Sequence, residues 1–193
     1  MNIVIIDYGA GNVKSLEFAI NRLGYQALVS DNAEVISKAD KVIFPGVGEA
    51  SSAMRKLKST GLDTLIPELK QPVLGICLGM QLMCSFSKEN DTIGLGIFDE
   101  KVSKFSSRVK IPQIGWNKIT QLKSALFEGI EEGTFVYMVH SYYVPLCVET
   151  IATSEYDILY SAALQKDNFF GVQFHPEKSS KSGSQILKNF LEL

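Results

Sequence analysis

Residues 73–81 read Val-Leu-Gly-Ile-Cys-Leu-Gly-Met-Gln. The first four form a continuous apolar run, which is typical of a strand buried on both faces of a sheet. Helical spacing of apolar residues begins immediately afterwards and predicts a helix over residues 78–86. A strand that passes directly into a helix, with a glycine on each side of Cys77 to permit a tight turn, indicates a parallel sheet covered by helices.

The chain upstream of this turn repeats the alternation of strand and helix. Asn12 is predicted to cap a helix that ends at Gly24, and Met54 and Leu57 carry the helical spacing of another. A short helix is predicted over residues 33–38. Strands are predicted over residues 2–6, 25–29 and 41–44. This rhythm favours a mostly parallel sheet with helices on both faces.

The second half of the chain is richer in strands. Strand-like segments separated by turns cover residues 114–119, 135–144, 151–154, 158–164 and 169–174. An amphipathic helix is predicted over residues 182–193. We expect the β-rich half to rejoin the sheet, so that residues 1–193 form a single α/β domain with a central, mostly parallel sheet and flanking helices.

The composition is that of an ordinary globular protein, with 193 residues, 46% apolar and 21% charged. The 19 basic and 21 acidic side chains leave a formal net charge of −2, which does not favour a nucleic-acid partner. The apolar run over residues 3–6 is too short to span a bilayer and has no basic leader, so we expect neither a signal peptide nor a membrane partner. The three cysteines fit a reducing compartment, and the chain is predicted to be soluble and cytoplasmic.

Cys77 is the first candidate for chemistry. Gly-x-Cys-x-Gly between a strand and a helix has the form of the nucleophile elbow of Gly-x-Ser-x-Gly enzymes, in which the turn exposes the central side chain. The helix N-terminus would favour a thiolate, and the N–H of Leu78 would point at an oxyanion. The alternative is a small core cysteine with glycines needed for packing. Cys84 and Cys147 lie in apolar surroundings without metal-ligand spacing and are predicted to be core residues.

A thiol nucleophile needs a base, and the chain has two histidines. His175 ends an apolar strand, and in an extended segment Glu177, two residues on, projects from the same face and can orient the imidazole. Pro176 restrains His175 to an extended conformation. The alternative is a histidine at a strand end beside a solvated glutamate. For His140, a hydrogen-bonded strand histidine is the first interpretation from the residues alone.

A competing pattern lies near the N-terminus. Gly9-Ala10-Gly11 follows the first strand and opens a helix, as in a dinucleotide-binding fingerprint, and Asp31 stands 20 positions beyond Gly11. Lys14 occupies the position of the third glycine of that fingerprint. A lysine there should not allow the close packing of helix on strand that the glycine provides. A non-catalytic nucleotide-binding module is therefore an alternative, but it leaves the Cys77 and His175 motifs unexplained.

Six motifs spaced along the whole chain carry a resemblance to a known family. Residues 75–81, residues 45–48 (Pro-Gly-Val-Gly) and residues 173–177 (Gln-Phe-His-Pro-Glu) together resemble class I glutamine amidotransferases. Residues 7–12, residues 112–117 (Pro-Gln-Ile-Gly-Trp-Asn) and the Ser-Tyr-Tyr stretch from Ser141 are similar to one branch of that family. In this branch, glutaminase subunits supply ammonia to a cyclase that makes imidazole glycerol phosphate for histidine synthesis.

The resemblance implies roles for particular residues. Cys77 is the implied nucleophile, His175 the general base and acid, and Glu177 the orienting carboxylate of a reaction that converts glutamine to glutamate and ammonia through a thioester. The implied oxyanion hole uses backbone at Val47, Gly48 and Leu78. The implied substrate-binding residues are Gln81, His140, Ser141 and Tyr142.

The resemblance also implies a partner and no cofactor or metal. The partner is a cyclase subunit built as a (β/α)₈ barrel, through which ammonia passes, and Asn12, Trp116 and Lys178 are the expected interface residues. Gln113 stands where many relatives have histidine. This position lies outside the triad, so the departure concerns the identity of the partner and the pathway and not the hydrolysis of glutamine. Two other glutaminases remain as alternatives, one serving amidation in nucleotide-sugar synthesis and one serving pyridoxal phosphate synthesis.

Overall fold

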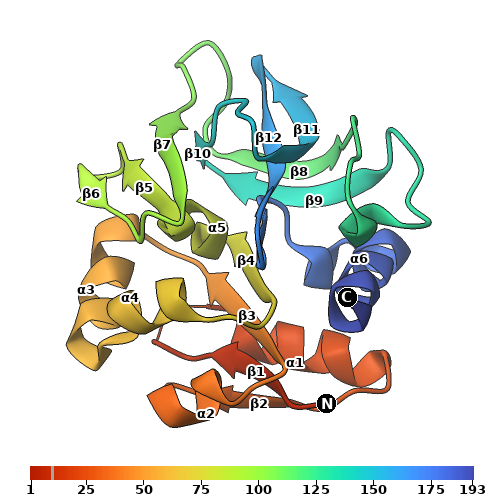
Figure 1. Cartoon of the computed structure of the whole chain (residues 1–193). Helices are drawn as coiled ribbons and strands as arrows, with labels where there is room; N and C mark the ends of the chain where they lie inside the picture. Colours follow the sequence, from red (N-terminus) through yellow and green to blue (C-terminus); the bar gives the residue numbers. More distant parts are fainter. Residues whose placement is uncertain (10) are drawn as a thin grey trace.

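The computed structural model describes residues 1–9 and 11–193, and its centre is a seven-stranded sheet (Figure 1). The strand order is β11-β12-β13-β4-β3-β1-β2. Strands β2, β1, β3, β4 and β13 run parallel, and β11 and β12 join them as an antiparallel edge. The strands are β1 Ile3–Ile6, β2 Ala27–Ser30, β3 Lys41–Gly46, β4 Val73–Cys77, β11 Thr150–Tyr156, β12 Ile158–Lys166 and β13 Phe169–Val172.

Helices cover both faces of this sheet, as the alternation of strand and helix predicts. Alternate residues of β1 point to opposite faces: Ile3 and Ile5 pack in the core under α1 and α6, whereas Val4 and Ile6 pack in the core under α2, α3 and α4. The helices are α1 Val13–Arg22, α2 Ala33–Ser37, α3 Ala50–Thr60, α4 Leu62–Leu65, α5 Leu78–Met83 and α6 Ser180–Glu192. The α/β fold with a mostly parallel sheet is confirmed.

Two smaller sheets extend the second half of the chain. One has the strand order β10-β7-β5-β6, and the other is the β8–β9 hairpin. Their strands are β5 Cys84–Ser87, β6 Thr92–Ile93, β7 Phe98–Lys104, β8 Gln113–Lys118, β9 Phe135–His140 and β10 Tyr142–Tyr143. Short 3-10 helices are η1 Ile66–Glu68, η2 Ala125–Phe127 and η3 Pro176–Lys178. Among the described residues, no helix has the length and apolar content needed to cross a membrane.

Two boundaries near the candidate site differ from the sequence-based expectation. The helix expected over residues 78–86 ends at Met83, because the chain from Cys84 pairs with β7, a strand that was not predicted. The strand expected over residues 135–144 breaks at Ser141, since β9 pairs with β8 and β10 pairs with β7. In both cases pairing with a distant strand overrides local propensity. Asn12 is at the N-cap of α1, but its side chain makes no capping hydrogen bond.

Candidate active site

Cys77 lies at the sharp turn between β4 and α5 with a φ of 53°. A residue other than glycine is strained in this backbone conformation, and such strain is characteristic of functional turns. The neighbouring glycine lets α5 begin flush against the sheet: a Cβ on Gly79 would stand 2.0 Å from the carbonyl oxygen of Phe44 in β3. The glycines therefore permit the tight turn that the sequence predicts, and the turn places the sulfur at the carboxyl end of β4.

A cavity of about 180 Å³ opens at this turn. It is smaller than the roughly 300–1,000 Å³ pockets that hold drug-sized ligands, so it suits a small metabolite. Its lining residues are Val47, Gly48, Cys77, Leu78, Gln81, Glu89, Val139, His140, Ser141, Tyr142 and His175. The structure thus gathers at one cavity every residue expected for catalysis, oxyanion binding and substrate binding except Glu177, which lies behind His175.

Glu89 is a charged cavity residue for which the sequence carries no signal. It lies in a polar turn after β5, where a charged side chain is expected to be exposed to solvent, yet it is half-buried in the structure. Its carboxylate accepts a hydrogen bond from the backbone N–H of Ala50, at 2.8 Å. Burial raises the pKa of Glu89, and this hydrogen bond partly offsets the rise. A partly desolvated carboxylate on the cavity wall is a suitable acceptor for a cationic group of a ligand.

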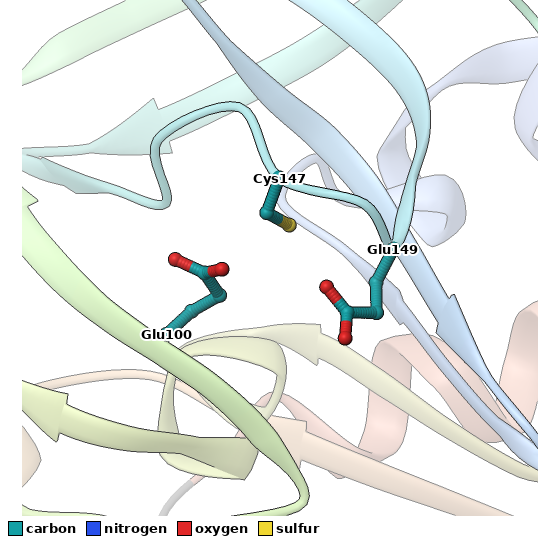
Figure 2. A group of neighbouring side chains, drawn as sticks. All are labelled: Glu100, Cys147 and Glu149. Carbon is teal, nitrogen blue, oxygen red and sulfur yellow. The ribbon is translucent and has the colours of Figure 1, made fainter.

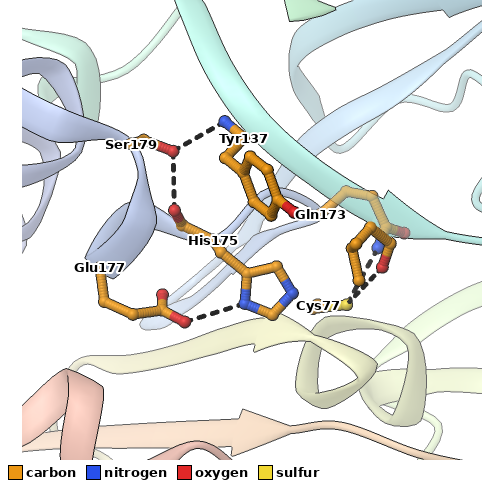
Figure 3. A network of polar contacts seen from close by, with 7 residues as sticks. Cys77, Tyr137, Gln173, His175, Glu177 and Ser179 are labelled. Carbon is orange, nitrogen blue, oxygen red and sulfur yellow. Dashed lines mark hydrogen bonds and ion pairs between the residues drawn. The ribbon is translucent and has the colours of Figure 1, made fainter. Parts of the chain in front are cut away.

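His175 and Glu177 form a buried pair in which Nδ1 of His175 lies 2.9 Å from a carboxylate oxygen of Glu177. The two side chains are 3% and 1% exposed. The pairing and the extended conformation of His175 are confirmed, but the segment does not stay extended: η3 begins at Pro176, and its turn brings the carboxylate back to the ring. Figure 3 shows the imidazole lying between the carboxylate and the Cys77 sulfur.

The imidazole of His175 presents its second nitrogen to the cavity side. Within residues 1–9 and 11–193, Nε2 has no hydrogen-bond partner. Burial lowers the pKa of His175, but the charges and hydrogen-bonding capacity of Cys77 and Glu177 outweigh burial and raise it to about 10. The site therefore favours an imidazolium beside the sulfur at neutral pH.

A chain of amide hydrogen bonds runs from the cavity wall to the sulfur. Gln81 Nε2 donates to the carbonyl of Tyr142 at 3.0 Å and to Oε1 of Gln173 at 2.8 Å. Gln173 Nε2 in turn donates to the sulfur of Cys77, at 3.6 Å. Gln81 is therefore buried in this network rather than free, and Gln173 is a second site residue, which the sequence presents only as part of a motif.

His140 also binds the Tyr142 carbonyl, through Nδ1 at 2.7 Å. Its Nε2 lies 3.3 Å from the hydroxyl of Tyr160, which also contacts Oε1 of Gln113 at 3.1 Å. Burial lowers the pKa of His140 to about 4, and the hydrogen bond to Tyr142 only partly offsets this fall. His140 is therefore neutral at pH 7, and Nδ1 carries the proton because a carbonyl can only accept.

This shift predicts that acid destabilises the protein through His140. Its pKa is about 4 in the folded state and about 6.5 in the unfolded chain, so between these values the unfolded chain binds more protons. Stability is retained above pH 6.5 and falls as the pH drops toward 4, by about 2 kcal/mol between pH 7 and pH 5. Urea unfolding gives the free energy of unfolding at pH 7 and at pH 5. The difference between the two values should be smaller in His140→Gln than in the wild type by that amount. An equal pH dependence in variant and wild type contradicts the assignment.

Two of the expected oxyanion-hole residues, Val47 and Gly48, line the cavity from the end of β3. β3 ends at Gly46, and Val47 and Gly48 follow it, exposed to the cavity, with Gly48 at a φ of 101°. The hydroxyl of Tyr8, on the loop after β1, donates to the carbonyl of Pro45 at 3.0 Å. This buried hydrogen bond holds the end of β3 from which Val47 and Gly48 continue.

Two of the three expected interface residues meet on one surface close to His175. Trp116 is 52% exposed on β8 and lies edge-on to the ring of Tyr137. The ammonium of Lys178, which is exposed in η3, lies 5.9 Å from the centre of the same ring. Asn12 is partly exposed at the start of α1. The structure therefore joins Trp116 and Lys178 through Tyr137, although they are far apart in the sequence.

The other two cysteines differ from each other. Cys84 is fully buried, so its prediction as a core residue is confirmed. Cys147 is only half-buried, because it lies in the loop before β11, where its sulfur faces the carboxylates of Glu100 and Glu149 (Figure 2). The donor atoms of these three side chains all lie within 4.8 Å of one another. Burial is the largest cause of the raised pKa of both thiols. At Cys147 the neighbouring carboxylates have a smaller effect on the pKa than burial and the local hydrogen bonds.

The two glycines of the nucleotide-binding alternative, Gly9 and Gly11, lie against other parts of the chain. Lys56 donates a hydrogen bond to the carbonyl of Gly9, and a Cβ on Gly11 would come within 3.2 Å of the Pro45 ring. Asp31 is exposed beyond the end of β2. Ala10 of this motif lies outside the described residues.

Solved structures of other proteins share the fold. A putative GMP synthase subunit from Thermoplasma acidophilum superposes with a TM-score of 0.77 at 20% identity, covering 100% of this chain and 92% of that one. The structure of PurLQS from Thermotoga maritima gives a TM-score of 0.74 at 17% identity, covering 99% and 97%. At these identities the likeness concerns the fold alone.

Sequence comparison is more specific. The family model of class-I glutamine amidotransferases matches residues 4–193. Imidazole glycerol phosphate synthase subunit HisH from Bacteroides fragilis is 55% identical, and that from Yersinia pseudotuberculosis 47% identical, with 100% of both chains covered in each case. The chain therefore belongs to the class I glutamine amidotransferase family, within the group of HisH subunits of imidazole glycerol phosphate synthase.

Proposed function

We propose that this chain hydrolyses the side-chain amide of glutamine at the Cys77 cavity, with Cys77, His175 and Glu177 as the catalytic triad. The observation that carries the proposal is the arrangement of His175, which binds Glu177 through Nδ1. Its Nε2, which has no hydrogen-bond partner in the part of the chain that the structure describes, is left for the cavity side. A nucleophile, a base and an orienting group in this order are what covalent acyl transfer requires. Membership of a glutaminase family supports the assignment.

The first half of the reaction forms a thioester. The Cys77 thiolate attacks the amide carbon, and the carbonyl oxygen becomes an oxyanion that accepts hydrogen bonds from the backbone N–H of Leu78 and the backbone at Val47 and Gly48. When the C–N bond breaks, His175 donates its proton to the departing nitrogen and ammonia leaves. The carbon remains bonded to sulfur.

The second half uses the change of charge at the sulfur. Cys77 is one of the groups that raise the pKa of His175 to about 10, and a thioester no longer carries the thiolate charge. Acylation therefore lowers the pKa of the imidazole and converts it from an acid into a base. Water then gives a proton to Nε2 and attacks the thioester, which releases glutamate and restores Cys77.

Glu177 orients His175, and its charge holds the proton on Nδ1 during the cycle. Glu177→Gln keeps the size of the side chain but allows its amide to donate to Nδ1, which favours the wrong tautomer for catalysis. We expect kcat for glutamine hydrolysis to fall by about 10⁴-fold with little change in KM. Steady-state glutamate release measures this effect; a loss smaller than tenfold contradicts the orienting role.

Glu89 is proposed to bind the α-ammonium group of glutamine, since it is the carboxylate on the cavity wall. Glu89→Gln keeps an acceptor for the N–H of Ala50 but removes the charge. We expect KM for glutamine to rise about tenfold, because a hydrogen bond to a charged group contributes about 1.5–3 kcal/mol, while kcat changes little. Glu49→Gln, which removes a neighbouring partly exposed carboxylate, is the control. An unchanged KM excludes this role.

The relatives are named as subunits of a synthase, so we further propose that ammonia passes to a cyclase subunit of (β/α)₈-barrel type in histidine synthesis. The surface formed by Trp116, Tyr137 and Lys178, with Asn12, is the proposed interface. It adjoins His175, whose backbone N–H donates to the carbonyl of Tyr137, so a partner bound there would lie close to the proposed catalytic histidine. The cyclisation itself belongs to that partner.

A glutamine analogue that carries a diazoketone in place of the amide tests the proposed function directly. The Cys77 sulfur would displace nitrogen from the analogue and form a stable thioether, so the protein should gain one label, located on the Cys77 peptide by mass spectrometry. Glutamine should protect against labelling, whereas asparagine should not. Labelling of Cys147 instead, or labelling that glutamine does not slow, contradicts the proposal.

A further inference from the structure

Gln173 is a polar side chain in an apolar environment. It follows β13, between Val172 and Phe174, and all three residues are fully buried. A buried amide costs free energy unless its groups are hydrogen-bonded, so an apolar side chain would be the simpler choice for packing alone. Both ends of the Gln173 amide have partners: Oε1 accepts from Gln81 and Nε2 donates to the sulfur of Cys77.

The direction of this amide is set by the hydrogen bonds behind it. The carbonyl of Tyr142 can only accept, so the group of Gln81 that faces it must be Nε2. The same nitrogen donates to Gln173, which places Oε1 of Gln173 toward Gln81 and leaves Nε2 for Cys77. The network therefore aims an N–H at the sulfur, and reversing the amide would set two donors against each other at Gln81.

We propose that Gln173 is a positioning residue that holds the Cys77 sulfur as a thiolate through this N–H. A hydrogen bond to the charged form of a group favours that form. The contact matters because the sulfur also lies 3.7 Å from the carbonyl of Val139, which can accept from a thiol but repels a thiolate. The N–H of Gln173 offsets that repulsion, because it is a donor in contact with the same sulfur (Figure 3).

Alkylation by iodoacetamide tests this inference, because only the thiolate displaces iodide at an appreciable rate. The reaction is followed at Cys77 by mass spectrometry between pH 5 and pH 9. Gln173→Met has a similar shape and no N–H, and Gln173→Glu retains an acceptor for Gln81 but sets a carboxylate oxygen against the sulfur. At pH 7 we expect alkylation about tenfold slower in Gln173→Met and slower still in Gln173→Glu, with both pH profiles moved to higher pH.

The control is Gln165→Glu, the same change in β12, where the side chain accepts from Ser124 away from the cavity. Its profile should match the wild type. His175 and Tyr8 also interact with the sulfur, and Glu89 and His140 line the cavity; all four are unchanged in these variants. If either Gln173 variant fails to fold, Gln173→Asn, which keeps the amide but is one carbon shorter, should give the same shift.

Coincident profiles for the wild type and a folded Gln173 variant would overturn the inference. The inference rests on the proposed function of Cys77 as the nucleophile, but alkylation requires no glutamine, so the two are separable. Coincident profiles in a chain that hydrolyses glutamine reject the role of Gln173 alone. Separated profiles in a chain that never hydrolyses glutamine support the hydrogen bond and reject the proposed function.

Discussion

Cys77→Ala is expected to abolish glutamine hydrolysis, with kcat reduced by about 10⁴-fold or more, because no thioester forms without the sulfur. The fold should persist. Alanine has the same Cβ at the strained φ of 53°, so the substitution neither adds to nor relieves the strain of the turn. Glutamate release and the urea unfolding midpoint of the same preparation separate the two effects.

The matched control is Cys84→Ala, which removes a sulfur that is fully buried just after α5 ends and does not line the cavity. It should cost about 1 kcal/mol of stability for the small void and leave kcat near the wild-type value. Retention of more than a tenth of the activity in Cys77→Ala, or comparable losses in both variants, contradicts a nucleophilic role for Cys77.

Gly79→Ala is expected to prevent stable folding. Its Cβ would stand 2.0 Å from the Phe44 carbonyl oxygen, an atom of the interior strand β3 that cannot withdraw without breaking the sheet. A backbone clash of this kind lies beyond ordinary overpacking, and we expect a loss of at least about 4 kcal/mol in the free energy of unfolding. Soluble yield and urea unfolding measure the effect.

Gly24→Ala provides the comparison, because a Cβ there meets no atom of the described residues within 4 Å and the cost comes from the φ of +86° alone. That strain should cost about 1–2 kcal/mol. If the two variants unfold at similar urea concentrations, α5 does not pack on β3 as the structure describes, and the account of the turn at Cys77 is wrong.

Short-range sequence patterns were sufficient to predict the turn at Cys77 and the contact between His175 and Glu177. The glycines flanking Cys77 determine a local backbone shape, and the spacing of His175 and Glu177 keeps both groups on one short segment. Local signals of this kind predict structure well because few alternatives compete within so few residues. Even here the reason differed, since a 3-10 turn rather than an extended strand brings Glu177 to His175.

The sequence could not show features that depend on distant pairing. Nothing local at Cys84 marks the end of α5, which follows from pairing with β7. Glu89 resembles any charged loop residue until the fold places it on the cavity wall. Gln173 reads as part of a motif, and its contact with Cys77 arises only because β13 and β4 lie side by side in parallel register.

Glutamate release from glutamine tests the central claim most directly, measured with the chain mixed with the proposed cyclase subunit and the ligand that this subunit cyclises. The account predicts release that this ligand stimulates and that Cys77→Ala removes, which would establish both the chemistry and the partner. Release that does not respond to the cyclase keeps the triad and rejects the proposed partner. No release under any condition contradicts the proposal that Cys77, His175 and Glu177 hydrolyse glutamine.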